Sequence, residues 1–252
     1  MGERLRVFLT GASGRVGSVL VPEFAECYAL TALYRQRRPD DPGAVFGDLG
    51  SPNVLRRAME GVDVVVHLAA YAHEADFVDV ILPNNVVGTY NVFRAAREAG
   101  VRRLVFASTC HVVQWRAAER TIRIADPLRP TGFYGVSKVF GEALGRHYHE
   151  QHGMEVVCIR IGWLLPYEEP GLKDDPHKRG IWLSPRDAVR LFRRAVEKPD
   201  VGYAVVFGTS LSAPRVVSLR EARELLDYEP EDDVVELYGS RPEDDALRER
   251  ED

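Results

Sequence analysis

The chain has 252 residues, of which 45% are hydrophobic, and a net charge of -5 at pH 7. This length suits one large domain, or one domain with a small appendage, that buries a proper core. The acidic balance provides no basic field for nucleic acid, no apolar run approaches membrane-spanning length, and no secretory segment opens the chain. Three cysteines are too few and too far apart for a disulfide framework or a metal site, and Cys27 and Cys158 are interpreted as core residues. We therefore expect a soluble, cytoplasmic protein with no metal, nucleic-acid or membrane partner.

Short apolar runs alternate with helical patterns through most of the chain. The predicted strands are residues 5–10, 29–34, 44–46, 63–68, 104–108 and 156–161. The predicted helices are residues 16–25, 51–60, 84–99 and 133–152, and Pro22 is expected to kink or shorten the first of them. Because the strand runs are continuously apolar, both faces of the sheet should be covered. The pattern predicts an α/β fold with a Rossmann-like, doubly wound parallel sheet.

The last third of the chain is predicted to form a small C-terminal substrate-binding appendage. A helix should begin after Ser184, because this hydroxyl, Pro185 and Asp187 supply a cap, a first-turn proline and an acid. Residues 166–180 are rich in proline and charge, and are interpreted as a loop that either covers a substrate or merely connects. The predicted division is a dinucleotide-binding domain over residues 1–165, the appendage with a returning strand and helix over residues 166–239, and a disordered tail over residues 240–252.

A glycine-rich turn follows the first predicted strand. Gly11, Gly14 and Gly17 stand between that strand and the first helix, which is the context in which such turns bind phosphate. Missing side chains let the backbone approach a pyrophosphate, and the helix N-terminus offers free N–H groups. A tight turn without a ligand is the alternative interpretation.

The end of the second strand bears on the choice of cofactor. A typical NAD site has an acid there, but Arg35, Arg37 and Arg38 precede the first acid, Asp40. Arginines suit the extra phosphate of NADP, so the prediction is NAD or NADP, with NADP slightly favoured; alternatively, they face water. Asp48, after the third strand, is expected either to meet the adenine or to cap a helix.

Tyr134 and Lys138 are four residues apart and share one face of a predicted helix. A nearby ammonium favours the phenolate, so Tyr134 is predicted to act as a base near neutral pH. Only four of the 33 basic residues are lysines. Lys138 is therefore interpreted as doing something that an arginine cannot do.

These motifs, together with Gly-Asp-Leu at Gly47, His-Leu-Ala-Ala at His67 and Phe-Ala-Ser-Thr at Phe106, resemble the extended short-chain dehydrogenase/reductase family. The resemblance covers nearly the whole chain through about Gly239. Within the family the chain is most similar to uronate dehydrogenases, through Phe-Ala-Ser-Thr-Cys-His-Val-Val, Ile-Arg-Ile-Gly and Trp-Leu-Ser-Pro-Arg-Asp.

The resemblance implies a role for each matching residue. Tyr134 would be the base, Lys138 would hold the nicotinamide ribose, and Thr109 would occupy the position of the catalytic serine. The implied cofactor-binding residues are Gly11, Ser13, Gly14, Arg15, Val16, Gly17, Tyr34, Arg35, Asp48, Leu49, Leu68, Ala69, Ala70, Asn85 and Lys138. The implied substrate-binding residues are Ser108, Cys110, His111 and Arg179.

Three departures from the uronate dehydrogenase pattern concern the substrate. Cys110 stands where an asparagine is expected, and Ala72 where a serine is expected. The arginine that should hold a carboxylate aligns with His177, two residues from Arg179. Either Arg179 takes over this role or the substrate has no carboxylate.

The resemblance implies a sugar dehydrogenase that oxidises C1 of a hexuronic acid to the lactone. The alternatives are a dehydrogenase of a neutral or phosphorylated hexose, a sugar-nucleotide epimerase or dehydratase, which the short chain disfavours, and a cofactor-binding sensor without turnover. Family members usually pair through helices like residues 84–99 and 133–152, so a homodimer or larger homo-oligomer is expected. His147, His149 and His152 are interpreted as a solvated helix end rather than a metal site.

Overall fold

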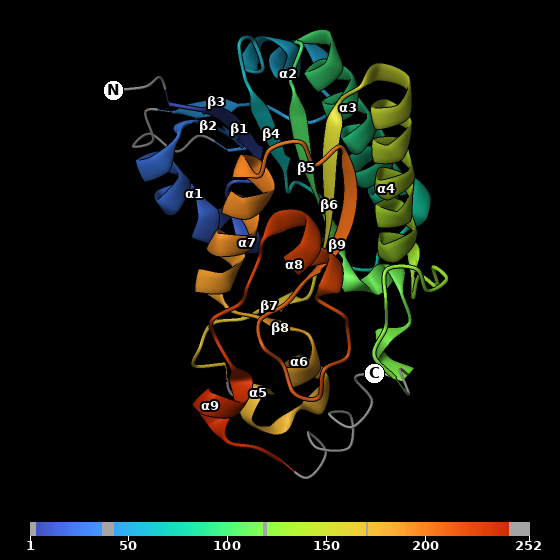
Figure 1. Cartoon of the computed structure of the whole chain (residues 1–252). Helices are drawn as coiled ribbons and strands as arrows, with labels where there is room; N and C mark the ends of the chain where they lie inside the picture. Colours follow the sequence, from blue (N-terminus) through green and yellow to red (C-terminus); the bar gives the residue numbers. More distant parts are fainter. Residues whose placement is uncertain (1–3, 37–42, 118–119, 170, 242–252) are drawn as a thin grey trace.

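The computed structural model describes residues 4–36, 43–117, 120–169 and 171–241. Seven strands form one sheet in the order β3-β2-β1-β4-β5-β6-β9, and every neighbouring pair is parallel (Figure 1). The strands are β1 (Arg6–Thr10), β2 (Ala29–Tyr34), β3 (Ala44–Phe46), β4 (Val64–His67), β5 (Arg103–Thr109), β6 (Glu155–Ile161) and β9 (Tyr203–Gly208). The predicted Rossmann-like sheet is confirmed, with β9 as the returning strand at its edge.

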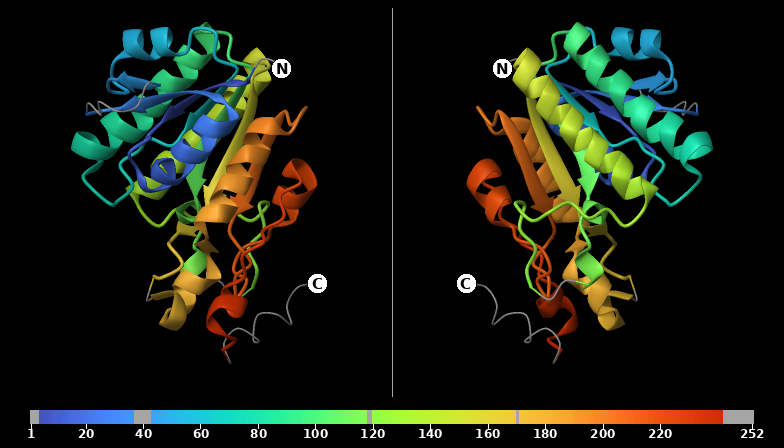
Figure 2. Two further views of the ribbon diagram at one scale, coloured as in Figure 1. Left: turned by 90° about the vertical axis from the view of Figure 1, so that its left-hand side faces the viewer. Right: turned by 90° about the vertical axis from the view of Figure 1, so that its right-hand side faces the viewer.

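Helices cover both faces of this sheet (Figure 2). One face carries α1 (Arg15–Cys27), α7 (Pro185–Glu197) and α8 (Arg220–Leu226); the other carries α2 (Pro52–Ala58), α3 (Gly88–Glu98) and α4 (Phe133–His152). Phe24 and Phe192 are fully buried on the first face, and Phe93 on the second. Burying one such side chain contributes roughly 1.5–3 kcal/mol. The continuous apolar strands are therefore explained by two separate cores.

Helix α1 differs from its prediction at two residues. It runs unbroken through Pro22, so the expected shortening is wrong. Pro22 removes the N–H that would bond to the carbonyl of Ser18, but both residues are exposed, so water can satisfy that carbonyl. Cys27 is also exposed, at the last turn, and its prediction as a core residue is wrong, whereas Cys158 is fully buried as predicted.

The helix predicted to start at residue 84 begins earlier and in another form. A π-helix, η1 (Phe77–Val87), leads directly into α3, and the side chain of Asp76 caps it by accepting from the N–H of Asp79 at 2.8 Å. The wider turn of a π-helix does not follow a 3.6-residue period, so the sequence pattern hides it. The last turn of η1 carries the buried Asn85 to the carboxyl edge of the sheet.

The C-terminal segments gather beyond the carboxyl ends of β6 and β9 (Figure 1). They comprise a two-stranded sheet of β7 (Trp163–Leu164) and β8 (Trp182–Leu183) with α5 (Gly171–Asp174), α6 (Pro176–Gly180) and α9 (Val234–Tyr238). The stretch predicted as a loop over residues 166–180 thus contains two short helices, and the side chain of Leu172 within it is fully buried. The division at residues 165 and 239 remains a prediction. Residues 242–252 of the tail lie outside the described residues.

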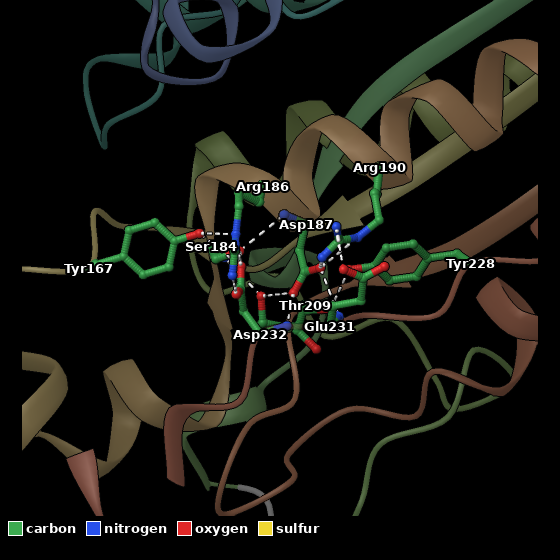
Figure 3. A network of polar contacts seen from close by, with 10 residues as sticks. Tyr167, Ser184, Arg186, Asp187, Arg190, Thr209, Tyr228, Glu231 and Asp232 are labelled. Carbon is green, nitrogen blue, oxygen red and sulfur yellow. Dashed lines mark hydrogen bonds and ion pairs between the residues drawn. The ribbon is translucent and has the colours of Figure 1, made fainter. Parts of the chain in front are cut away.

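A buried polar network ties these segments to the main sheet (Figure 3). Ser184 caps α7 as predicted, accepting from the N–H of Asp187 at 3.0 Å. Asp187 is fully buried and accepts from Ser210 Oγ at 2.6 Å and from the N–H groups of Glu231 and Asp232 at 3.0 and 3.1 Å. Arg186 pairs with Asp232 in turn. The start of α7 therefore anchors the chain that leads into α9.

Candidate active site

The glycine turn lies where the carboxyl ends of β1 and β4 meet. Gly11 has a φ of +77°, and a Cβ there would lie 2.7 Å from the N of Ala69. A Cβ on Gly17 would lie 2.3 Å from the carbonyl oxygen of Gly11. Only glycine fits this close passage of two chain segments, and the sheet order reverses direction beside β1, where α/β proteins bind their ligands.

A cleft of about 1010 Å³ extends from this turn across the carboxyl ends of β5 and β6. An adjoining pocket of about 140 Å³ shares Gly11, Gly14 and Arg35 with it. Sites of this size hold cofactors and small ligands. Together they are lined by the predicted residues Gly11, Ser13, Gly14, Arg15, Val16, Gly17, Arg35, Asp48, Leu49, Leu68, Ala69, Ala70, Ser108, Thr109, Cys110, His111, Tyr134 and Lys138.

The predicted catalytic residues meet in this cleft. The ammonium of Lys138, which is buried, donates to the carbonyl oxygen of Ala107 at 2.8 Å and lies 5.7 Å from the centroid of the Tyr134 ring. The side chain of Thr109 lines the same cleft and favours the ionised form of the Tyr134 phenol, which lowers its pKa. Thr109 Oγ1 also accepts from the N–H of His111 at 3.2 Å. The start of α4 and the end of β5 thus bring a phenol, an ammonium and a hydroxyl together.

Burial controls both titrating groups. It lowers the pKa of Lys138 to about 7 and raises the pKa of Tyr134 to about 12, and the effect of the Thr109 side chain only partly offsets the rise. The prediction that Lys138 lowers the pKa of Tyr134 is therefore wrong for the protein alone. The reason is desolvation, which penalises the phenolate and the ammonium alike and leaves Lys138 only partly charged near pH 7.

Three predicted site residues do not line the cleft or its adjoining pocket. Tyr34 is buried near Phe46, with 6.4 Å between their ring centroids. Asn85 accepts from the N–H of Tyr71 at 2.8 Å and donates to the carbonyl oxygen of Tyr71 at 3.0 Å, so its amide fixes a wall of the cleft. The guanidinium of Arg179 is fully buried and donates to the backbone carbonyls of Leu172 and Gly239 at 3.3 and 2.9 Å.

One predicted substrate residue lines the cleft but is buried, and three arginine and acid positions fall outside the described part of the chain. Cys110 is almost fully buried, and its thiol donates to the carbonyl of Arg160 at 3.6 Å. Arg37, Arg38 and Asp40 lie outside the described residues.

Three of the cleft residues that sequence reasoning missed bear on the chemistry of the site. Trp163 stands two residues after the carboxyl end of β6, a position that could have indicated it from the sequence. Glu169 lies in the stretch predicted to be a loop, and pairs there with Lys178. Glu74 accepts from the N–H groups of Phe133 and Tyr134 at 3.0 and 3.1 Å, a contact across 60 residues of chain that no local pattern signals.

Within the described residues, no helix is both long and apolar enough to cross a bilayer, and no three side chains of His, Cys, Asp or Glu gather as metal ligands would.

This combination of a glycine turn, a cleft at the switch in strand order and a Tyr-Lys-Thr site defines a dinucleotide-dependent oxidoreductase of the short-chain dehydrogenase type. Residues 7–178 match the NAD dependent epimerase/dehydratase family, and the chain belongs to it.

Known relatives share most of their length with this chain. It is 41% identical over 248 residues to L-arabinose 1-dehydrogenase (NAD(P)(+)) of Haloferax volcanii, covering 90% of this chain and 96% of the relative. It is 35% identical over 261 residues to the NAD-dependent glucose-6-phosphate dehydrogenase of the same organism, covering 95% and 98%. Among solved structures, a mutant of uronate dehydrogenase from Agrobacterium tumefaciens complexed with NAD has a TM-score of 0.83 at 31% identity, covering 91% of this chain and 86% of that one. The predicted family resemblance is confirmed.

Proposed function

We propose that this enzyme oxidises C1 of a cyclic sugar to the lactone, with NAD or NADP as the hydride acceptor and Tyr134 as the general base. The observation that carries the proposal is the placement of Tyr134, Thr109 and Lys138 in one cleft with the glycine turn. The relatives support the same chemistry, since all three are named as sugar dehydrogenases.

Tyr134 and Thr109 have different roles in the proposed reaction. The anomeric hydroxyl of the sugar donates to Tyr134 Oη, and Thr109 Oγ1 holds the same oxygen. The hydroxyl proton passes to Tyr134 as the C1–H pair departs as hydride, so C1 loses two electrons and gains a double bond to oxygen. A dinucleotide held by the glycine turn and Lys138 would accept the hydride and would bring a positive charge into the cleft. That charge would oppose the burial that raises the pKa of Tyr134.

The residues around the glycine turn suit a dinucleotide. Gly11, Gly14 and Gly17 carry no side chain, and α1 begins at Arg15 within this segment, so the free N–H groups of its first turn are available to a pyrophosphate. Arg35 lines the cleft on the same side, which supports the slight preference for NADP. Asp48 lines the adjoining pocket, although its carboxylate also accepts from the N–H of Gly50 at 2.7 Å.

The hexuronic acid predicted from the sequence requires a cation for its carboxylate. Arg179 does not line the cleft. Among the described residues between 161 and 181 that do line it, Lys178 is the cation. The names of the relatives span a neutral sugar, a sugar phosphate and a uronate, so they leave all three classes open.

A panel of sugars with NAD and NADP tests the proposal. The panel contains L-arabinose, glucose, glucuronate, galacturonate, glucose 6-phosphate and UDP-glucose, and the absorbance of reduced nicotinamide is followed. We expect reduction with at least one free sugar and formation of its lactone. Conversion of UDP-glucose without net reduction would instead indicate an epimerase, and cofactor binding without turnover of any sugar would favour a sensor.

The homo-oligomer and the cytoplasmic location remain predictions. The exposed apolar side chains of Val87, Tyr90, Phe133 and Val136 on η1, α3 and α4 support pairing through these helices. Analytical ultracentrifugation of the purified chain tests this directly, because a monomer at micromolar concentration would contradict it.

A further inference from the structure

One wall of the cleft combines an aromatic ring with an ion pair. Trp163, Glu169 and Lys178 all line this wall. The ammonium of Lys178 donates to Glu169 Oε1 at 2.7 Å and lies 5.8 Å from the centroid of a Trp163 ring. The hydrogen bond from Lys178 lowers the pKa of Glu169, so this carboxylate is ionised at neutral pH. The positive charge of Lys178 is thus neutralised by the carboxylate of Glu169.

The other charged groups near this ion pair do not release Lys178 from Glu169. Arg15 also lowers the pKa of Glu169, but it belongs to the glycine turn, where phosphates bind. Arg116 lies 5.7 Å from Trp163 and is not one of the residues that line the cleft.

The rest of the lining adds negative rather than positive charge. Burial, and then the charge of Arg116, lower the pKa of His111, so its imidazole is neutral near pH 7. Glu74 contributes a carboxylate, which the amides of α4 hold. Apart from Lys138 and the arginines of the cofactor side, the described lining therefore carries two carboxylates and one ammonium.

We propose that the substrates of this enzyme are neutral aldoses, an inference that rests on the proposed function. In this proposal Glu169 excludes sugar acids and sugar phosphates by neutralising the charge of Lys178. A carboxylate or phosphate entering the cleft has to compete with Glu169 for Lys178, and it meets the further carboxylate of Glu74 in the lining, which disfavours it. A neutral sugar meets no such repulsion. Its hydroxyls can bond to the ion pair while its C–H face packs on the indole of Trp163.

Four variants test the role of this pair: Glu169→Gln, Lys178→Met, the double variant, and Glu168→Gln as the matched control. Glu168 is the exposed neighbour of Glu169 and does not line the cleft, so its variant loses the same charge without touching Lys178. The kcat and KM of each protein are measured with L-arabinose, glucuronate and glucose 6-phosphate.

The wild type should prefer L-arabinose. Glu169→Gln should raise kcat/KM for glucuronate at least about tenfold, mainly through KM, and change the value for L-arabinose far less. Glu168→Gln should behave like the wild type, and adding Lys178→Met to Glu169→Gln should abolish the gain.

Two results would overturn the proposal separately from the proposed function. A wild type that turns over glucuronate or glucose 6-phosphate better than any neutral sugar would contradict the substrate class while leaving sugar oxidation intact. Unchanged glucuronate kinetics in Glu169→Gln would contradict the role of the pair. Failure of every protein to oxidise any of these sugars, despite binding the cofactor, would instead contradict the proposed function on which the inference rests.

Discussion

The carboxylate of Glu74, which lines the same cleft, accepts from the backbone N–H of Tyr134 at 3.1 Å. Its two oxygens accept from the N–H groups of Phe133 and Tyr134. These N–H groups have no acceptor within the helix because they belong to the first turn of α4. Gly132 leaves room for this contact, since a Cβ there would lie 2.2 Å from Glu74 Oε1. The loop after β4 is therefore joined to the start of α4, which carries Tyr134, the proposed general base.

Glu74→Ala should lower kcat roughly 10- to 100-fold, because a shift of the reacting groups by about 1 Å can cost that much. The dissociation constant for the cofactor should change little. Gly132→Ala should produce a similar loss by displacing the same carboxylate. In the double variant the two losses should not add, because the clash is absent once Glu74 is gone. Fully additive losses would show that Glu74 and Gly132 act separately. Glu150→Ala, at the far end of α4, is the control for lost charge.

Lys138 should make stability depend on pH. Its pKa is about 7 in the folded protein against 10.5 for the free side chain. Between these values the unfolded chain binds more protons, so the free energy of unfolding rises with pH, and the penalty of burying the ammonium is fully present below pH 7. Lys138→Met should therefore be more stable than the wild type at pH 6, by a few kcal/mol at ~1.4 kcal/mol per pKa unit, and the gap should narrow towards pH 10.

Urea denaturation at pH 6, 8 and 9.5 measures this gap. Lys173→Met, which removes an exposed lysine, should track the wild type at every pH. A gap that stays constant with pH would rule out a buried, titrating ammonium at position 138.

Asp187 should contribute far more stability than its neighbour in the same network. Both Asp187 and Glu231 pair with Arg190, but the side chain of Asp187 is 0% exposed and that of Glu231 is 67% exposed. Asp187→Ala leaves buried donors unsatisfied and should cost about 3 kcal/mol or more. Glu231→Ala should cost less than about 1 kcal/mol, as exposed ion pairs do. Equal losses in thermal or urea unfolding would refute the anchoring role of the start of α7.

Arg35 should contribute to the choice of cofactor. If it meets the extra phosphate of NADP, Arg35→Ala should weaken NADP binding about tenfold or more and NAD binding much less, because charge-assisted bonds to phosphate are strong. Fluorescence titration with both reduced cofactors measures the ratio, with the exposed Arg57 replaced by alanine as the control. Equal weakening of both cofactors would contradict the NADP preference.

The regular part of the fold is predictable from the sequence because it depends on local patterns. The apolar strands, the glycine turn and the cap at Ser184 all follow from neighbouring residues. The π-helix η1 is not predictable in this way, since its period is unusual. The exposure of Cys27 and of Pro22 depends on which face of α1 meets the sheet.

The candidate site divides in the same way. Tyr134, Lys138 and Thr109 carry motif signals, and the structure brings them together. Arg179 has the right chemistry for a substrate contact, but tertiary packing buries its guanidinium under Gly239 and Leu172. Glu74 and Glu169 act through partners that local spacing does not connect, so only coordinates reveal them. The pKa of Tyr134 rises because the phenol is buried. The sequence shows the neighbouring lysine but not this burial, so it does not predict the rise.

The central claim is that Tyr134 accepts the proton as hydride leaves the sugar. Tyr134→Phe removes one oxygen from the cleft and leaves the glycine turn and Lys138 in place. Oxidation of the sugar found in the substrate panel is followed by nicotinamide absorbance, beside a direct titration of cofactor binding. The account predicts a loss of kcat of at least about 100-fold, as expected for a missing general base, with cofactor affinity nearly unchanged. Wild-type turnover by Tyr134→Phe would contradict it.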